Sequence, residues 1–275
     1  MALPLDTLET FRTMEFLGRD RPLPVVTALM LRLCSLSDLT IAMTLPTDHE
    51  VDGSFNVPPV VSAISTLVFE IHEEFSPDDA RRALERFLAS LTLPCLTGIF
   101  FHAIEYPPTP LPWPHFEFLS LSERSSFHAH LTDLALYEVI IMESELLQCL
   151  AVLPALVFLS ISDQPAVLPD HTEHLLITDT LLAALTKTTE SPCLVPQLRI
   201  FGVQSILKFD DNVYLKFLLS RLQGEADQGP LVYTLRWFPG YKRALDDAVW
   251  AQLQNLRTQE VVFRFLPGPA KEQDE

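Results

Sequence analysis

One apolar pattern occurs twice in this chain at a fixed spacing. Leu131, Leu134 and Leu136 recur 25 residues later as a second set, formed by Leu156, Leu159 and Ile161. Alternating apolar residues predict short strands with one buried face. Between the two sets, Ser144 can cap a helix that Pro154 ends, with apolar residues at helical spacing: Leu146, Leu150 and Leu153. The predicted unit is therefore a strand, a turn, a helix and the next strand.

Looser copies of the apolar pattern run along most of the chain. They predict further strands, and a last strand is expected over 261–265. The copies end in these residue pairs: Leu39 and Ile41, Leu67 and Phe69, Ile99 and Phe101, Leu119 and Leu121, Phe201 and Val203, Leu235 and Trp237. Because one small strand–helix unit cannot bury its own apolar face, such units must stack on one another.

Acidic residues mark the expected helix starts between these strands. Helices are predicted to begin near 76–79, 178, 210–212 and 246–247. Carboxylates are favourable at the positive end of a helix dipole. They could also serve acid–base catalysis, but the helix-terminal role is the preferred interpretation.

These elements together predict an α/β fold, a solenoid with a parallel sheet on its inner face. We expect a single irregular repeat domain over 1–266, whose N-terminal part acts as a cap. The acidic tail 267–275 is expected to be disordered. Two stretches, 44–58 and 163–176, are interpreted as insertion loops.

The pattern LxxLxL followed by a helix resembles a leucine-rich repeat. Longer segments, "LTDLALYEVIIMESELLQCLAVLPALVFLSISD" and "CLVPQLRIFGVQSILKFDDNVYLKFLLSRL" among them, resemble the repeat region of fungal F-box/leucine-rich-repeat proteins over most of 25–265. The resemblance implies a horseshoe with the sheet on the concave face and helices on the convex face. It also implies substrate recognition for ubiquitin ligation. No F-box module is evident, so a cullin-ligase adaptor would bind only if an F-box existed upstream.

The net charge and the cysteine positions limit which classes of partner and which cell compartment are expected. Nineteen Lys and Arg stand against 36 Asp and Glu, a formal charge of −17, which disfavours nucleic acids and anionic membranes. The four cysteines form no CxxC motif, and their apolar settings predict buried thiols. No secretory signal is evident. We expect a monomer in the cytoplasm or nucleus that binds proteins.

Enzymatic motifs are missing from the sequence. It contains no GxGxxG, GxxxxGK[ST], HExxH or GxSxG. His128-x-His130, on an expected extended stretch, and His171-x-x-His174 lack a third ligand at metal-site spacing. We therefore expect neither metal nor cofactor and no catalysis. Two alternatives stay open: an orphaned repeat scaffold without a ligase link, and an enzyme whose site lies in the 163–176 loop near His171 and His174.

Strand alternation predicts the binding residues. If the apolar positions of each pattern point into the core, their neighbours point onto the concave face. Aromatic and arginine side chains are favoured in protein interfaces. The residues expected to line this face are Glu70, Phe100, His102, Phe118, Tyr137, Phe158 and Arg236.

Overall fold

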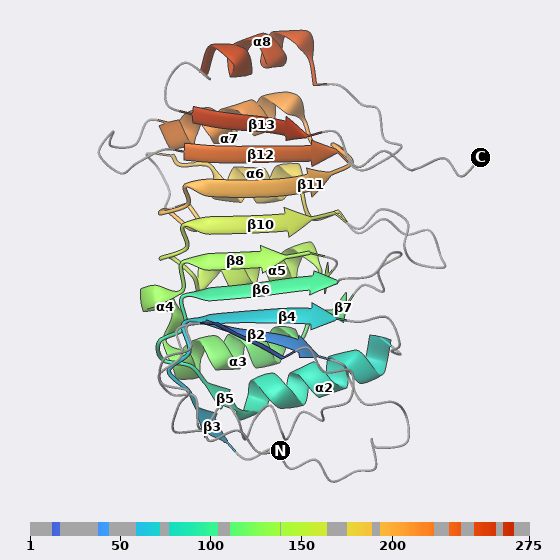
Figure 1. Ribbon diagram of the computed structural model, residues 1–275. Coiled ribbons are helices and arrows are strands. Elements are labelled where there is room, and N and C mark those ends of the chain that lie inside the picture. The colour runs from blue at the N-terminus through green and yellow to red at the C-terminus, as the bar shows by residue number, and fades with distance from the viewer. Residues whose placement is uncertain are drawn as a thin grey trace, which may run out of the picture. The chain divides into compact units, whose positions relative to one another are not determined.

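The protein alternates parallel strands with helices (Figure 1). A computed structural model describes residues 13–16, 38–43, 59–71, 77–103, 111–137, 139–163, 175–188, 193–222, 231–237, 245–256 and 261–266. The chain divides into two compact units, Met1–Ile141 and Met142–Glu275. They are called the first unit and the second unit below. The α/β prediction is confirmed, whereas the single domain over 1–266 stays a prediction.

The first unit contains a parallel sheet with the strand order β1-β2-β4-β6-β8. Its register aligns the apolar patterns as predicted, because Leu67 pairs with Ile99 and Ile99 pairs with Leu134. The strands are β1 (Thr13–Phe16), β2 (Asp38–Met43), β4 (Thr66–Ile71), β6 (Gly98–Ala103) and β8 (Asp133–Leu136).

In the described residues of the first unit, three helices and two small sheets accompany the parallel sheet. The helices are α2 (Pro77–Ser90), α3 (His115–Ser125) and α4 (Phe127–His130). The small parallel pairs join β3 (Val60–Val61) to β5 (Leu91–Thr92) and β7 (Leu111–Pro112) to β9 (Val139–Ile140). Helix α2 begins where the sequence predicts, with Pro at its first position.

The strand predicted around Leu119 and Leu121 is wrong, because these residues lie in α3. Buried positions in this segment are Phe118, Leu121, Ser122 and Ser125, whereas Phe116 is 79% exposed. Spacings of three, four and seven residues describe a helical face, and no strand alternates in that way. The LxxLxL pattern contains one i, i+3 step, so it fits a helix as well as a strand.

The second unit carries a parallel sheet in the order β10-β11-β12-β13, with a helix after each of the first three strands and one before the first. The strands are β10 (Phe158–Ser162), β11 (Ile200–Ser205), β12 (Leu231–Trp237) and β13 (Val261–Leu266). The helices are α5 (Glu143–Ala151), α6 (Asp179–Leu185), α7 (Asp211–Leu222) and α8 (Asp247–Leu256).

The register of β12 corrects the predicted alignment by two residues. The sequence pattern matched Leu235 with Phe201, but Phe201 pairs with Tyr233 and Leu235 pairs with Val203. Tyr233 and Leu235 are both buried. Because side chains alternate with a period of two, a shift of two residues keeps the same face inward. The predicted face of β12 is therefore right although its register is not.

Helix starts follow the predictions closely, with one exception. Thr178 caps α6 by accepting a hydrogen bond from the Leu181 amide at 3.1 Å. Helix α5 begins one residue before the predicted cap Ser144, and its Glu145 side chain accepts from the Met142 amide at 3.0 Å. A glutamate at the third helical position can reach back in this way, so Ser144 is not needed as the cap.

Candidate partner-binding faces

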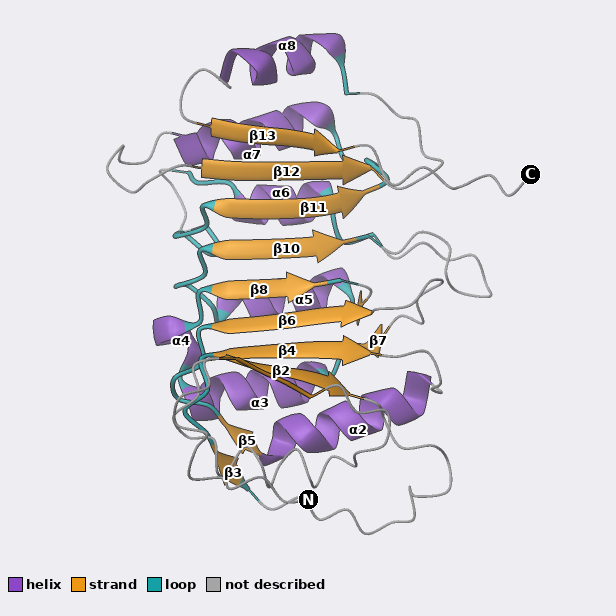
Figure 2. Cartoon of the chain, viewed as in Figure 1, coloured by secondary structure: helices purple, strands orange, loops and turns teal. Residues whose placement is uncertain are grey.

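In each unit, taken separately, the helices lie on one side of the parallel sheet (Figure 2). Ring contacts identify the side of each sheet that packs against the helices. The ring centroids of Phe69 and Phe87 in α2 are 5.9 Å apart, and those of Phe201 and Phe217 in α7 are 5.2 Å apart. Residues next to these inward positions point to the opposite side. No element among the described residues covers that opposite side in either unit. These two uncovered sides are the candidate binding surfaces.

The uncovered side of the first unit, called the first face, carries aromatic and acidic side chains. Phe100 lies between Val68 and Ala135 in the register and is half-buried. Its ring lies over Gly98: a Cβ built on that glycine would stand 2.8 Å from Phe100 Cε2. The first face consists of Thr66, Val68, Gly98, Phe100, Asp133, Ala135 and Tyr137.

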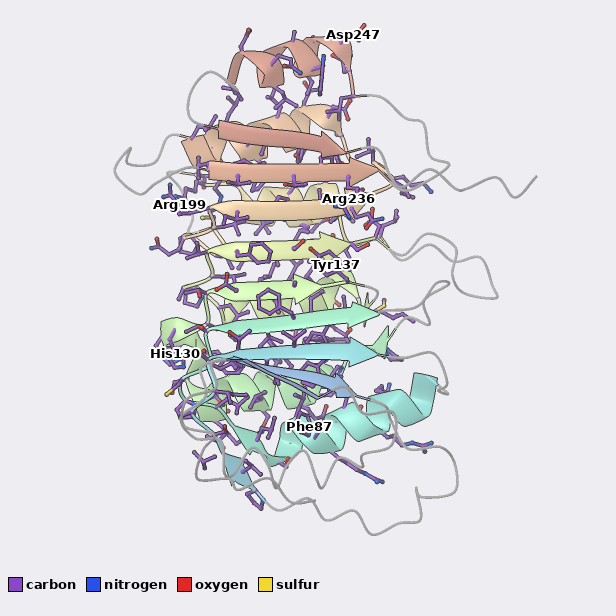
Figure 3. The ribbon with its side chains drawn as sticks, in the orientation of Figure 1. Phe87, His130, Tyr137, Arg199, Arg236 and Asp247 are labelled. Carbon is purple, nitrogen blue, oxygen red and sulfur yellow. The ribbon has the colours of Figure 1, made fainter. Side chains whose placement is uncertain are left out.

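Tyr137 follows the end of β8, and its amide donates to the carbonyl oxygen of Phe101 at 3.1 Å. That bond continues the ladder one step beyond the strand and fixes the Tyr137 backbone. Its side chain is half-buried and drawn in Figure 3. The hydroxyl of neighbouring Thr132 donates to Asp133 at 2.6 Å, so the carboxylate on this face is held in place.

The uncovered side of the second unit, called the second face, forms three rows across β10, β11 and β12. The register aligns the same position of each strand, so the rows follow directly from the pairing. The apolar row is Phe158, Ile200 and Val232; the small row is Ser160, Gly202 and Thr234; and the polar row is Ser162, Gln204 and Arg236. Arg236, labelled in Figure 3, is the exposed end of the polar row.

Four of the predicted binding residues stand on these faces: Phe100, Tyr137, Phe158 and Arg236. Glu70 and His102 pair with each other in β4 and β6, but their side chains lie outside the described residues. Phe118 is a correction. It is 1% exposed in α3, where its ring packs 4.9 Å from that of Trp113, so it belongs to the core.

The second face also contains residues that the sequence reasoning did not select. The strand register places three further residues on the same side of the sheet as Arg236 and Phe158: Ile200, Gln204 and Thr234. The signal was present, because alternation assigns them to the same side. They were missed because the selection favoured aromatic and charged side chains.

A buried carboxylate follows β10. Asp163 is fully buried, and its Oδ1 accepts from the amides of Leu176 and Ile177 at 2.8 and 2.9 Å. Its Oδ2 accepts from the Ser205 hydroxyl at 2.6 Å and the Ile206 amide at 3.3 Å. Burial raises the pKa of Asp163, and these four hydrogen bonds oppose part of that rise. Asp163 therefore joins β10 to the chain after β11 and is a structural group.

A buried guanidinium holds the next connection. Arg221 is 3% exposed in α7, and among the described residues its side chain donates to carbonyl oxygens and to no carboxylate. Its acceptors are the carbonyls of Leu185, Leu194, Val195 and Pro196. Burial lowers the pKa of Arg221 from its ordinary value. The arrangement closes the C-terminal end of α6, where carbonyl groups lack helical partners.

The acids at the helix starts link one helix to the next in the second unit. Asp179 accepts from the amide of Asp210 at 2.7 Å, and Asp211 accepts from the amide of Asp246 at 2.7 Å. The Thr178 hydroxyl donates to Glu143 in the same manner. The sequence predicts these acids at helix starts, and Asp211 and Asp247 are the first residues of α7 and α8. The contacts between successive helices are what it did not foresee.

The histidines and cysteines of the described ranges form no metal-ligating cluster. His128 and His130 lie in the helical turn α4 and not on the predicted extended stretch. Cys95 is exposed, contrary to the prediction of buried thiols, whereas Cys149 is buried. Residues 171 and 174 lie outside the described residues. Within the described part of the chain, no group of three metal-ligating side chains is found.

Comparison with known proteins adds no assignment: no family model, no curated protein and no solved structure matches the chain. None of the helices in the described ranges is long and apolar enough to cross a membrane. The candidate site therefore depends on the geometry of the two faces.

Proposed function

We propose that this chain is a non-enzymatic protein-binding repeat domain that takes its partner on the uncovered sheet faces. The observation that carries the proposal is the position of Phe100, Tyr137 and Phe158. Each stands on the side of its sheet opposite the helices and is only half-buried. Large rigid side chains of this kind supply much contact area at low entropic cost.

The proposal extends to architecture and biological role. Parallel strands joined by helices on one side support a leucine-rich-repeat-like solenoid, a horseshoe in which the bare sheet is concave. By resemblance to F-box/leucine-rich-repeat proteins, the domain would recognise substrates for a ubiquitin ligase in the cytoplasm or nucleus. The second candidate, a repeat scaffold with no ligase link, uses the same faces and differs only in its partners.

Affinity purification with the whole chain from cell extract tests the binding role. The variant carries three substitutions, Phe100→Ala, Tyr137→Ala and Phe158→Ala. The matched control is Phe116→Ala, which removes an equally large ring that is 79% exposed on α3 and belongs to neither face. We expect at least one protein to bind the natural chain and the control but not the triple variant, and to bind directly once purified.

The results separate the alternatives. Recovery of a cullin-ligase adaptor with the natural chain would support the ligase role, and its absence alongside a face-dependent partner would favour the scaffold. Equal binding by the natural chain and the triple variant would overturn the use of these faces. Circular dichroism of all variants must match, so that lost binding is not lost folding.

A further inference from the structure

The second face differs in charge from the chain that carries it. The protein has a formal charge of −17, yet none of the nine residues of the second face is acidic. Its one charged member is Arg236. The first face, by contrast, includes Asp133. A positive group on a face without acids, in so acidic a protein, is a local inversion of the overall charge.

Arg236 is exposed, and no hydrogen bond or ion pair to it is found among the described residues. Guanidinium groups bind carboxylates with paired, parallel hydrogen bonds. Arg264 of β13 stands in the register beside Thr234, so a second arginine occupies the adjoining strand. Within the described part of the chain, the polar row therefore ends in a cation with no carboxylate paired to it.

The other two rows define the shape of an occupant. The apolar row, Phe158, Ile200 and Val232, is half-buried and offers hydrophobic contact. The small row is lowest at Gly202, which has no side chain; a Cβ there would stand 2.7 Å from Ser160 Oγ, so Ser160 would have to shift to admit one. In β11 the larger side chains of Ile200 and Gln204 flank Gly202, so a partner backbone can approach between them; in β10 the polar-row residue is Ser162, which is 3% exposed.

From these features we infer that the second face binds a protein segment in which an apolar side chain is followed by a carboxylate. Val232 and Arg236 are four residues apart on one strand, about 13 Å at the usual rise per residue. A partner in extended conformation that runs in the same direction as β12 spans that distance with an apolar residue at i and Asp or Glu at i+4. This inference rests on the proposed protein-binding function and specifies its partner.

Selection of short random-sequence peptides displayed on phage, against the whole chain, tests the inference. We expect enrichment of peptides with an aromatic or aliphatic residue four positions before Asp or Glu. Against Arg236→Glu, the acidic position should be replaced by Lys or Arg. The matched control is Arg86→Glu, the same charge change at an exposed arginine of α2, and it should select the original acidic peptides.

A fluorescence titration of the best selected peptide gives the size of the effect. Arg236→Glu should weaken binding roughly tenfold or more, Arg236→Gln should weaken it less, and Arg86→Glu should leave it unchanged. Phe158→Ala should also weaken binding, because it removes the apolar row's ring. Because Arg236 is exposed, its two substitutions leave the core intact, and circular dichroism verifies the folding of every variant, including Phe158→Ala at a half-buried position.

Failure of the inference and failure of the proposed function give different results. Peptides that need Phe158 but show no acidic preference would overturn the carboxylate inference and leave the face as a binding surface. Peptides that are enriched equally on the natural chain, Phe158→Ala and Arg236→Glu would overturn both for this face. Acidic selection retained on Arg236→Glu would place the cation elsewhere and also overturn the inference.

Discussion

The two units fill their cores by different means. The core of the first unit contains a series of packed aromatic rings. Phe69 stacks on Phe101 with ring centroids 4.6 Å apart, and the centroids of Phe101 and Trp113 are 5.3 Å apart. In the second unit rings also pack, as Phe217 does against Phe201 and Tyr233, but the core includes the buried charges Asp163 and Arg221 as well. Packed rings are stabilised by burial of their large apolar area, whereas a buried charge is tolerated only when hydrogen-bond partners surround it.

The buried charges of the second unit coincide with unusual backbone. Val195 and Leu207 have positive φ angles of 44° and 58°, a region that costs energy for branched or bulky residues. The Val195 carbonyl accepts from Arg221 at 3.0 Å. The Leu207 amide donates to Ser205 Oγ, which in turn donates to Asp163. The comparison shows that buried charged groups fix the connecting chain in the second unit, whereas the described connections of the first unit are held by neutral groups such as Ser125, whose Oγ accepts from the Leu93 amide at 2.8 Å, and by the exposed Arg124.

One pair of arginines makes the comparison quantitative. Arg124 of α3 donates to the Leu88 and Leu91 carbonyls at the end of α2, just as Arg221 of α7 donates to the carbonyls after α6. Arg124 is exposed, whereas Arg221 is 3% exposed and lies 5.8 Å from the Phe217 ring. Both side chains therefore bind the carbonyl groups at the end of the preceding helix, Arg124 at the surface and Arg221 in the core.

Replacing each arginine with methionine should give the largest difference between the units. We expect Arg221→Met to lower the free energy of unfolding by about 3 kcal/mol, because it leaves several buried carbonyls without donors. Arg124→Met should cost about 1 kcal/mol, since water can replace its hydrogen bonds. Urea denaturation followed by circular dichroism measures both. Equal losses would show that burial does not decide the value of this contact.

Alkaline pH should act on the second unit through two tyrosines. Burial raises the pKa of Tyr214 and of Tyr233 well above 10, and the nearby Arg221 and Arg199 offset only part of the rise for Tyr233. Above pH 10 the unfolded chain therefore releases protons that the native state retains, so stability falls as pH rises. The stability that the two neutral phenols contribute is complete below pH 10.

The expected loss is about 1 kcal/mol for each tyrosine at pH 11. The double variant Tyr214→Phe, Tyr233→Phe should lose correspondingly less stability than the natural chain between pH 8 and pH 11, measured by urea denaturation. An identical loss in both proteins would mean that these phenols titrate alike in the native and unfolded states.

Much of the fold could be predicted from the sequence because its signals are local. The alternation in Leu134-x-Leu136 and Phe201-x-Val203 gave strands, and the acids before Asn212 and Ala248 gave helix starts at the right residues. A helix or strand of this kind is specified by its own few residues and by burial of one side. The same reasoning placed Arg236 and Phe158 on one side of their strands.

What could not be predicted depends on contacts between distant residues. Leu119 and Leu121 fit a strand pattern and a helix pattern equally, and only the packing of Phe118 against Trp113 decides for the helix. The predicted register of β12 differs from the observed one by two residues for a similar reason, since the predicted and the observed alignments bury the same face of the strand. Asp163 and Arg221 were missed because their partners lie 13 to 43 residues away and carry no motif.

The smallest expected effects concern the glycines of the two faces. A Cβ at Gly98 would meet the Phe100 ring at 2.8 Å, and a Cβ at Gly202 would meet Ser160 Oγ at 2.7 Å. A ring must move as a whole to relieve such a contact, whereas a hydroxyl can turn to another staggered position. Alanine also stabilises by restricting the unfolded chain, by about 0.4 to 1 kcal/mol.

We therefore expect Gly98→Ala to lower the free energy of unfolding by about 1 kcal/mol and Gly202→Ala to change it by less than about 0.5 kcal/mol. Urea denaturation of the two variants side by side measures the difference. The reverse order would mean that Ser160, which is 4% exposed, is held more rigidly than the half-buried ring of Phe100. In that case the small row of the second face is a fixed floor, and a partner backbone must adapt to it.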